Sequence, residues 1–392
     1  MKHDGWEVKK LGEICETITK GTTPKTIGYD FTDSGINFIK VESINELGCF
    51  ITENFTHISN ECHKALMRSQ LEEYDMLFSI AGALGRTAIV DKSILPANTN
   101  QALSIIRLKE KNVRFLYYLQ YYLKSDRIKN YIDSIKVGVA QMNLSLGQLK
   151  EFPIIIPPLP EQFRIVEELD QLSKIIEKKR QQLSELDNLA QSIFYDMFGN
   201  VNSFVPLSEY VDGLLAGKSL AGDEVCVNKV LKTGAVTYDY FDEKQVKSLP
   251  LNYEPNIEHK VNRNDLLVSR MNTAELVGAC AYVWEIDGSV YLPDRLWKAD
   301  VKENANPIYI WKALIQPKSK EQIRQYASGT SGSMKNISKN SFLKIQIPFV
   351  SLSLQQLFAQ KIEAIEKEKE LIKQSIKETE ELFNSRMDYY FG

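Results

Sequence analysis

The segments of this chain that could bind a phosphate group or a metal ion each lack part of the spacing that such chemistry needs. Gly213 to Ser219 reads GLLAGKS, but three residues separate its first glycine from the Gly-Lys-Ser, where a phosphate-binding loop has four. His57, Cys62 and His63 lie close together, but no second Cys or His pair follows at ligand spacing. We therefore expect ordinary surface residues there, with no metal site and no nucleotide site.

Catalytic side chains are also scarce. Asn306 to Tyr309 reads NPIY, close to the NPPY with which adenine methyltransferases hold a flipped base. The third residue differs and no glycine-rich cofactor loop precedes it, so we expect a helix to begin there instead. With four histidines in the chain, no constellation of Ser, His and an acid is recognisable. We predict a chain without catalytic residues or a cofactor of its own.

Polar stretches in the first half have the composition of loops that contact nucleic acid. Lys20 to Lys25 reads KGTTPK, and its lysines and hydroxyls suit phosphates and base edges. Gly82 to Arg86 reads GALGR, which would bring backbone close to a duplex and present one guanidinium. A plain turn and a tight bend in a sheet are the respective alternatives. The candidate DNA-contacting residues are Lys20, Thr22, Thr23, Lys25, Arg86 and a run of amides that suits adenine, namely Asn98, Asn100 and Gln101.

The second half offers comparable candidates. They are Arg270, Asn272, Arg295, Lys335 and Asn336. The net charge of -3 carries no global signature of nucleic-acid binding. Any such surface must be local, because acidic helices can dominate the total charge while a groove stays basic.

The elements that must position these loops follow an α+β pattern. Apolar or alternating runs separated by Gly, Asn, Asp and Pro predict strands at 36–41, 76–80, 87–90 and 102–108. Helical spacing predicts one amphipathic helix over 113–132. A loop from 138 leads into a short helical turn by 149, and 152–156 is extended. Residues 1–155 are therefore predicted to form one α+β domain.

Residues 201–350 repeat this plan. Four pairs of segments match in the same order: Val8–Ile14 with Phe204–Tyr210, Asp75–Ser79 with Asp265–Ser269, Gly85–Val90 with Gly278–Val283, and Met142–Ser145 with Lys335–Ser338. The offset runs from 190 (265 − 75) to 196 (204 − 8), so loops differ in length while strands correspond. Four ordered matches indicate an internal repeat.

A long charged helix from Pro157 to Gly199 separates the two domains, and a similar helix runs from Gln355 to Gly392. They end alike, in SIFYDMFG and SRMDYYFG, at an offset of 193 (392 − 199). Apolar residues spaced alternately by four and three, interrupted at Lys179, predict a seam along each helix. The seam residues are Ile165, Leu169, Leu172, Ile176, Leu183, Leu186 and Ile193, and in the second helix Phe358, Ile362, Ile365, Ile372, Ile376 and Phe383.

A helix of this length must bury its seam, and its own repeat is the nearest partner. We therefore predict two similar domains, 1–155 and 201–350, joined by helical regions 156–200 and 351–392 that pair antiparallel as an intramolecular coiled coil. A rod of roughly 57 Å would hold the domains about one and a half turns of B-DNA apart, with approximate internal twofold symmetry. A homodimeric coiled coil is the alternative.

The composition describes an ordinary protein of two or three domains, with 25% charged and 43% hydrophobic residues. No apolar run approaches the ~18 residues of a membrane span, and MKHDGWEVKK lacks the apolar core of a signal peptide. Five cysteines without a Cys-x-x-Cys indicate free thiols in a reducing compartment. We expect a cytoplasmic protein.

Over its whole length the sequence resembles the specificity subunits of type I restriction-modification systems. Pro157, Pro158, Leu159, Glu161, Gln162, Ile165 and Val166 match that family's PPLxEQxxIV, and Gly21, Thr23 and Pro24 match its GxTP loop. Gly85 and the pair Asn100-Gln101 also match. The second copy, SLSLQQLFAQKI at 351–362, keeps Gln356 but lacks the prolines and the glutamate, and Leu220 stands where the GxTP proline would be.

The resemblance implies a non-catalytic reader of double-stranded DNA. Each target-recognition domain would read one half of a bipartite site, and the helices would set the gap. Two adenine-methyltransferase subunits, which carry S-adenosylmethionine, would bind the helical region, and translocase-nuclease subunits would join them. Charged residues such as Glu167, Glu168, Lys178, Lys179 and Arg180 would then be protein-binding surface, or simply a solvated face. A self-contained methyltransferase or nuclease and a protein-only scaffold are the alternatives.

Overall fold

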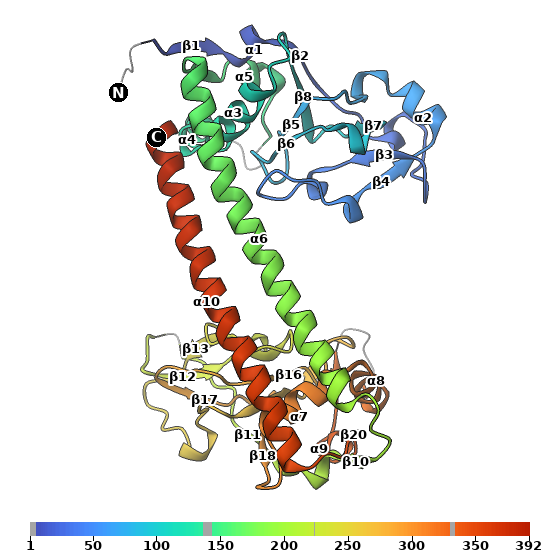
Figure 1. Ribbon diagram of the computed structural model, residues 1–392, viewed down its shortest axis with the longest axis vertical. Coiled ribbons are helices and arrows are strands. Elements are labelled where there is room, and N and C mark those ends of the chain that lie inside the picture. The colour runs from blue at the N-terminus through green and yellow to red at the C-terminus, as the bar shows by residue number, and fades with distance from the viewer. Residues whose placement is uncertain (1–4, 136–142, 223, 330–333) are drawn as a thin grey trace. The chain divides into compact units, whose positions relative to one another are not determined.

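The computed structural model describes residues 5–135, 143–222, 224–329 and 334–392, which form two compact units. Unit 1 comprises Met1–Gln181 and Lys373–Gly392, and unit 2 comprises Gln182–Ile372. Two long helices, α6 (Leu159–Phe198) and α10 (Leu352–Phe391), each contribute one segment to each unit (Figure 1). Both begin within a few residues of the predicted starts.

Unit 1 is built on a four-stranded antiparallel sheet and a three-stranded sheet (Figure 1). In spatial order the first contains β2 (Cys15–Lys20), β8 (Leu103–Leu108), β5 (Met76–Ser79) and β6 (Thr87–Ile89), and the second contains β4 (Thr56–Ile58), β3 (Ile36–Ile39) and β7 (Ala97–Thr99). β3 and β7 are parallel, and β1 (Glu7–Lys10) pairs with β9 (Pro153–Ile156). The strands predicted in this half are confirmed.

Helical elements complete unit 1. They are α1 (Leu11–Ile14), α2 (Asn60–Ala65), α3 (Val113–Lys124), α4 (Asp126–Ser134), α5 (Leu146–Lys150) and the 3₁₀ turns η1 (Pro24–Ile27), η2 (Val41–Ser43), η3 (Thr52–Asn54), η4 (Met67–Ser69) and η5 (Lys92–Ile94). The prediction of one helix over 113–132 was wrong, because Ser125 is extended (φ −66°, ψ 156°) and its hydroxyl donates to Tyr122 O at 2.7 Å. The predicted loop at 138–142 lies outside the described residues, and the expected helical turn is α5.

The four-stranded sheet of unit 1 is covered on both faces. Met76 and Phe78 of β5 belong to the core cluster that includes α3 and α4, whereas Leu77 between them packs in a second cluster with Ile39 and Ala97 of the three-stranded sheet. Alternate side chains of a strand point to opposite faces, so this near-continuous apolar run serves two cores at once.

Unit 2 has the same sheets in the same order. The four-stranded sheet contains β11 (Val211–Ala216), β18 (Leu296–Val301), β14 (Leu266–Ser269) and β16 (Cys280–Tyr282), and the three-stranded sheet contains β13 (Val246–Ser248), β12 (Asn228–Leu231) and β17 (Ser289–Tyr291). β12 and β17 are parallel, as β3 and β7 are. The remaining elements are β10 (Phe204–Pro206) with β20 (Gln346–Pro348), β15 (Met271–Asn272) with β19 (Lys335–Asn336), α7 (Pro307–Leu314), α8 (Pro317–Tyr326), α9 (Lys339–Phe342), η6 (Leu207–Glu209), η7 (Thr233–Val236) and η8 (Ile257–His259).

The segments matched in the sequence occupy corresponding places. Asp75–Ser79 runs into β5 and Asp265–Ser269 into β14, the third strands of the two four-stranded sheets. Gln162 at the start of α6 has its counterpart in Gln355 at the start of α10, so the assignment of that counterpart to Gln356 was wrong. Gln162 Nε2 donates to Pro157 O and Gln355 Nε2 donates to Val350 O, both at 2.8 Å, whereas Gln356 is exposed.

In unit 1 the segments of α6 and α10 run antiparallel. Glu168 forms an ion pair with Arg386 at 2.7 Å. Eleven residues further along α6, Lys179 Nζ donates to Ser375 Oγ at 2.5 Å and to Thr379 Oγ1 at 3.1 Å. Glu168 and Lys179 are therefore engaged with α10, which corrects the expectation that they belong to an exposed face.

In unit 2 the two segments are also antiparallel. Asp187 accepts a hydrogen bond from Lys369 at 2.7 Å, and further along α6 the rings of Phe194 and Phe198 lie 5.7 and 5.1 Å from that of Phe358. All the predicted seam residues of both helices are buried or half-buried. The apolar faces are thus covered within each unit.

Phe358 lies at the centre of an aromatic cluster that ties both helix segments to the rest of unit 2. It is fully buried and contacts Tyr309 of α7 as well as the two α6 phenylalanines. Phe358→Ala should lower the free energy of unfolding of unit 2 by about 3–5 kcal/mol through lost burial and a cavity. Urea unfolding followed by tryptophan fluorescence reports on this unit, because three of the four tryptophans (residues 284, 297 and 311) belong to it.

Leu357→Ala is the matched control for this substitution, because Leu357 neighbours Phe358 in sequence but its side chain is 48% exposed. We expect a change within about 0.5 kcal/mol for the control. Equal effects of the two substitutions would show that the aromatic cluster does not anchor α10.

Lys124, at the end of α3, is held in unit 1 by a hydrogen bond from Nζ to Leu47 O at 2.6 Å, and burial lowers its pKa to about 8. An unfolded lysine has a pKa of about 10.4, so the folded chain binds fewer protons between these values. This group's contribution to stability therefore rises as pH increases from about 8 to about 10.4. Over that range the wild type should gain about 1–3 kcal/mol relative to Lys124→Met in urea unfolding. A difference that is constant with pH would contradict the assignment.

Candidate nucleic-acid interface

In unit 1 the loop after β2 is held against the loop between β7 and β8. Thr22 N donates to Thr99 O at 3.2 Å, and the Thr23 hydroxyl donates to the side-chain oxygen of Gln101. A Cβ on Gly21 would lie 1.9 Å from Thr99 O, so only glycine permits this approach of the two backbones. The two loops therefore form one surface with polar side chains from both.

Unit 2 contains the same arrangement with different side chains. A Cβ on Gly217 would lie 1.9 Å from Leu292 O, the Ser219 hydroxyl donates to the Asp294 carboxylate, and Asp294 N donates to Ser219 Oγ at 3.3 Å. Gly217 to Leu220 thus corresponds to Gly21 to Pro24. The GLLAGKS segment comprises the end of strand β11 and the start of this loop. Its second glycine, Gly217, makes the close backbone approach to Leu292 O.

Several residues predicted in the first half come together at this surface. Lys20, Lys25 and Gln101 are exposed, whereas Thr22, Thr23 and Asn100 are half-buried. Asn100 Oδ1 accepts from Ala102 N at 3.1 Å and shapes the second loop.

One prediction in this half was wrong, and a second candidate is partly engaged in the fold. Asn98 is wholly buried, and its amide nitrogen donates to Leu66 O at 3.1 Å and Ser69 Oγ at 3.0 Å, so it cannot read a base. Arg86 is half-buried and its Nη1 donates to Ile44 O at 3.0 Å, so this guanidinium supports a neighbouring loop. Sequence order gave no indication of either partner.

The five residues predicted in the second half also lie together. Asn272 faces Lys335 in the β15–β19 pair, and Asn336 faces the residue beside Asn272. Arg270 N donates to Arg295 O at 3.1 Å, which joins this pair to the loop that precedes β18. Arg295 is exposed. Sequence reasoning missed Ser219, Asp294 and Trp297 here, although Gly217 follows Gly21 at an offset of 196 (217 − 21) and would have identified the loop.

The other sequence motifs do not add a site. The helix predicted at NPIY is confirmed as α7, where the Asn306 side chain accepts from Ile308 N at 2.9 Å. Cys62 is fully buried, which corrects its assignment to the surface. Within the described ranges, no three His, Cys, Asp or Glu side chains are grouped as a metal site would require.

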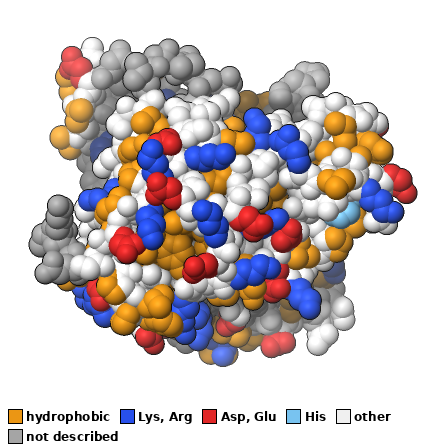
Figure 2. Space-filling view, turned by 90° about the horizontal axis from the view of Figure 1, so that it is seen from above, with side chains coloured by type: hydrophobic (Ala, Val, Ile, Leu, Met, Phe, Trp, Pro, Cys, Tyr) orange, Lys and Arg blue, Asp and Glu red, His pale blue; other side chains and the backbone are white. Residues whose placement is uncertain are grey.

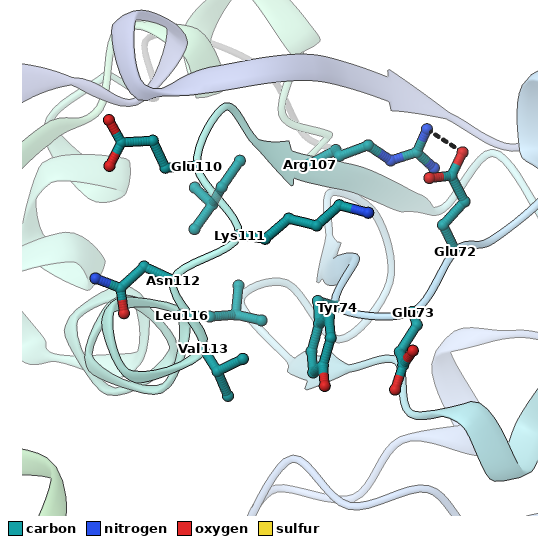
Figure 3. A pocket seen from close by; sticks show the side chains of 10 residues that line it. Glu72, Glu73, Tyr74, Arg107, Glu110, Lys111, Asn112, Val113 and Leu116 are labelled. Atoms are coloured by element: carbon teal, nitrogen blue, oxygen red, sulfur yellow. Dashed lines mark ion pairs between the residues drawn. The ribbon is translucent and has the colours of Figure 1, made fainter.

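A pocket of unit 1 is lined by a structural ion pair (Figure 3). Arg107 Nη1 lies 2.6 Å from Glu72, and Arg107 also donates to both oxygens of the buried Asp75 at 2.7 and 2.8 Å. Burial raises the pKa of Asp75, although the hydrogen bonds from Arg107 oppose the shift. In unit 2, Asp265, which matches Asp75, pairs with Lys298 at 3.6 Å. Arg107 is therefore engaged by both carboxylates within this part of unit 1.

On the face shown in Figure 2, charge is not gathered in one broad patch. Figure 2 shows a face of the molecule on which Lys and Arg side chains are interspersed with Asp and Glu.

Comparison with known proteins shows which proteins this chain resembles in sequence and in fold. Residues 3–188 match the sequence profile of the type I restriction modification DNA specificity domain. The EcoKI specificity subunit of Escherichia coli K12 is 24% identical over 359 residues, which cover 84% of this chain and 75% of that subunit. The EcoBI specificity subunit of E. coli is 32% identical over 176 residues, 44% of this chain and 36% of that subunit.

Solved structures share the fold over nearly the whole chain. A chain from a structure of the assembly and conformational transition of the type I R-M system has a TM-score of 0.57 at 17% identity, covering 99% of this chain and 98% of that one. The type I S subunit from M. genitalium has a TM-score of 0.55 at 13% identity, covering 99% and 96%. At these identities the structural likeness shows the fold alone.

Among the helices of the described residues, none has the length and apolar composition needed to cross a bilayer. The profile match, the curated relatives and the shared fold agree with the resemblance found in the sequence. Residues 3–188 of this chain thus match the type I restriction modification DNA specificity domain, and the chain is similar over most of its length to type I restriction enzyme specificity subunits.

Proposed function

We propose that the chain reads a bipartite site in double-stranded DNA, with each unit contacting one half-site through its paired loops. The observation that carries this proposal is the repetition of one loop contact, at Gly21 in unit 1 and at Gly217 in unit 2, each closed by glycine against a carbonyl oxygen. The close approach of glycine to a carbonyl oxygen is shared while the side chains differ, with Thr23 and Gln101 in one and Ser219 and Asp294 in the other. Two similar supports with different polar groups suit an asymmetric target.

The polar groups on these loops match the chemistry of base edges and phosphates. Gln101 is exposed and presents an amide, which pairs with adenine in the major groove, while Lys20 and Lys25 are exposed cations that suit phosphates. In unit 2, Arg295 and Lys218 supply positive charge beside Asp294, whose carboxylate can accept from cytosine.

In the proposal the two long helices set the gap between half-sites and dock two adenine-methyltransferase subunits. S-adenosylmethionine would be bound by those subunits, and translocase-nuclease subunits would join for cleavage. Support comes from α6 and α10, each 40 residues long and so about 60 Å in extent, which join the two units in the chain. Their pairing in each unit leaves the opposite faces available for partners.

Gly21→Ala and Gly217→Ala should each weaken base preference at one half-site and leave the other intact. A methyl group 1.9 Å from a carbonyl oxygen forces the two loops apart. We expect the base preference of the affected half-site to fall about tenfold or more. The measurement is selection from a randomised duplex pool by the full chain with its methyltransferase subunits, followed by sequencing.

Gly213→Ala is the control for these substitutions, because no atom lies within 4 Å of the added Cβ. It should retain both half-sites. Loss of both half-sites in either loop variant, with folding intact, would count against independent reading by the two units.

Removing one heptad from each helix tests the role of α6 and α10. The facing segments Gln181–Asp187 and Lys369–Ser375 can be deleted together, because Asp187 pairs with Lys369. Seven residues shorten each helix by about 10.5 Å, equivalent to about three base pairs. Selection should return the same half-sites with a gap shorter by about three base pairs. An unchanged gap would reject the helices as the spacing element.

A further inference from the structure

The backbone of Arg270 in unit 2 is hydrogen-bonded through both its N–H and its carbonyl group. Its N–H donates to Arg295 O at 3.1 Å and its carbonyl accepts from Ile337 N at 3.0 Å. It follows directly on β14, whose last residues pair with β18. The position of its Cα is therefore fixed by two neighbouring segments.

Ile80 occupies the same position in unit 1. Its N–H donates to Ala102 O and its carbonyl accepts from Leu144 N, both at 2.8 Å. It follows directly on β5, the strand that corresponds to β14. The two units thus carry an identical backbone arrangement with an isoleucine in one and an arginine in the other.

The side chain of Arg270 is oriented by the core of unit 2. Its Cζ lies 5.9 Å from the centre of the Trp297 ring, and its Nε is buried without a hydrogen-bond partner. Trp297 is 1% exposed, and its Nε1 is buried without a partner as well. Asn336 Oδ1, on the strand that pairs beside Arg270, is a third such atom. Unpartnered buried polar atoms are rare in native proteins and tend to mark functional sites.

The terminal nitrogens of the Arg270 guanidinium differ from its Nε, because they are not among the buried atoms without a partner. No described residue accepts a hydrogen bond from them, and they are absent from the buried unpartnered atoms, so this end of the guanidinium reaches solvent. The backbone N–H of Arg270 is bonded to the carbonyl of Arg295, whose side chain is exposed as well. Nε is enclosed and the guanidinium lies beside the Trp297 ring while its terminal nitrogens reach solvent, which restricts the orientations open to the group before any ligand binds.

We propose that Arg270 is a specificity-determining residue of unit 2 that donates two hydrogen bonds to the O6 and N7 of a guanine. The proposal rests on the DNA-reading function proposed above. A pre-oriented fork matches the two adjacent acceptors that guanine presents in the major groove, which is the commonest arginine contact to a base. Unit 1 has no counterpart of this contact, because Ile80 is apolar and 4% exposed.

The test compares base preferences of the full-length chain with its methyltransferase subunits on a randomised duplex pool. In Arg270→Lys and Arg270→Gln, preference for guanine at one position of one half-site should fall between about 5-fold and about 150-fold. The other half-site should be unchanged. Arg270→Lys keeps the charge, so a contact to phosphate would survive in it while a bidentate contact to guanine would not.

Arg263→Gln is the matched control, with the same change of charge in the same unit. Arg263 lies before β14, at the opposite end from Arg270, and its exposed side chain pairs with Glu285 at 3.2 Å. It should select the wild-type motif. Arg270→Ile installs the residue that unit 1 holds on this backbone, and thermal unfolding should show that it folds.

The outcomes separate the two proposals. A wild-type chain that selects no motif overturns the proposed function and this inference with it. A wild-type chain that selects two half-sites, with Arg270→Gln weakening all sequences equally, leaves the proposed function standing and makes Arg270 a phosphate contact, which overturns the inference. Loss of one guanine in both Arg270→Lys and Arg270→Gln supports it.

Discussion

The pairing of α6 with α10 is the constraint on which both units depend. In unit 2 the two helices meet through Phe194, Phe198 and Phe358, which also pack on Tyr309. In unit 1 the rings of Tyr118 and Tyr122 contact Phe391 near the end of α10. Each sheet domain thus packs on a piece of both helices and not on one helix of its own. Aromatic side chains bury large areas, so these contacts contribute strongly to holding helix and domain together.

Polar contacts between α6 and α10 help to specify the register of their pairing. Lys179 meets the hydroxyls of Ser375 and Thr379 in unit 1, whereas Lys369 meets Asp187 in unit 2. A polar residue in an otherwise apolar seam costs stability but disfavours other registers, where it would be buried without a partner. Register within each unit is therefore specified by charge and hydrogen bonding as well as by the apolar spacing.

Much of the fold could be predicted from the sequence because it is periodic. The strands at Ile36, Met76 and Thr87 were marked by short apolar runs, and the two long helices by heptads. What failed depended on contacts that spacing cannot show. Asn98 finds its partners 32 and 29 residues away, and Cys62 lies in a small core beneath α2. The sequence therefore identified the candidate DNA-contacting loops more reliably than it identified which of their side chains are exposed.

Unit 2 is a continuous stretch of chain, whereas unit 1 is not, and this affects the order in which the protein can fold during synthesis. The main core of unit 1 includes Met387, Tyr390 and Phe391, which are translated after all of Gln182–Ile372. Domains usually fold in the order in which they leave the ribosome. Here the unit that is begun first lacks part of its core until the second is complete. The nascent first domain therefore keeps an apolar surface exposed until Lys373–Gly392 has been synthesised and completes its core.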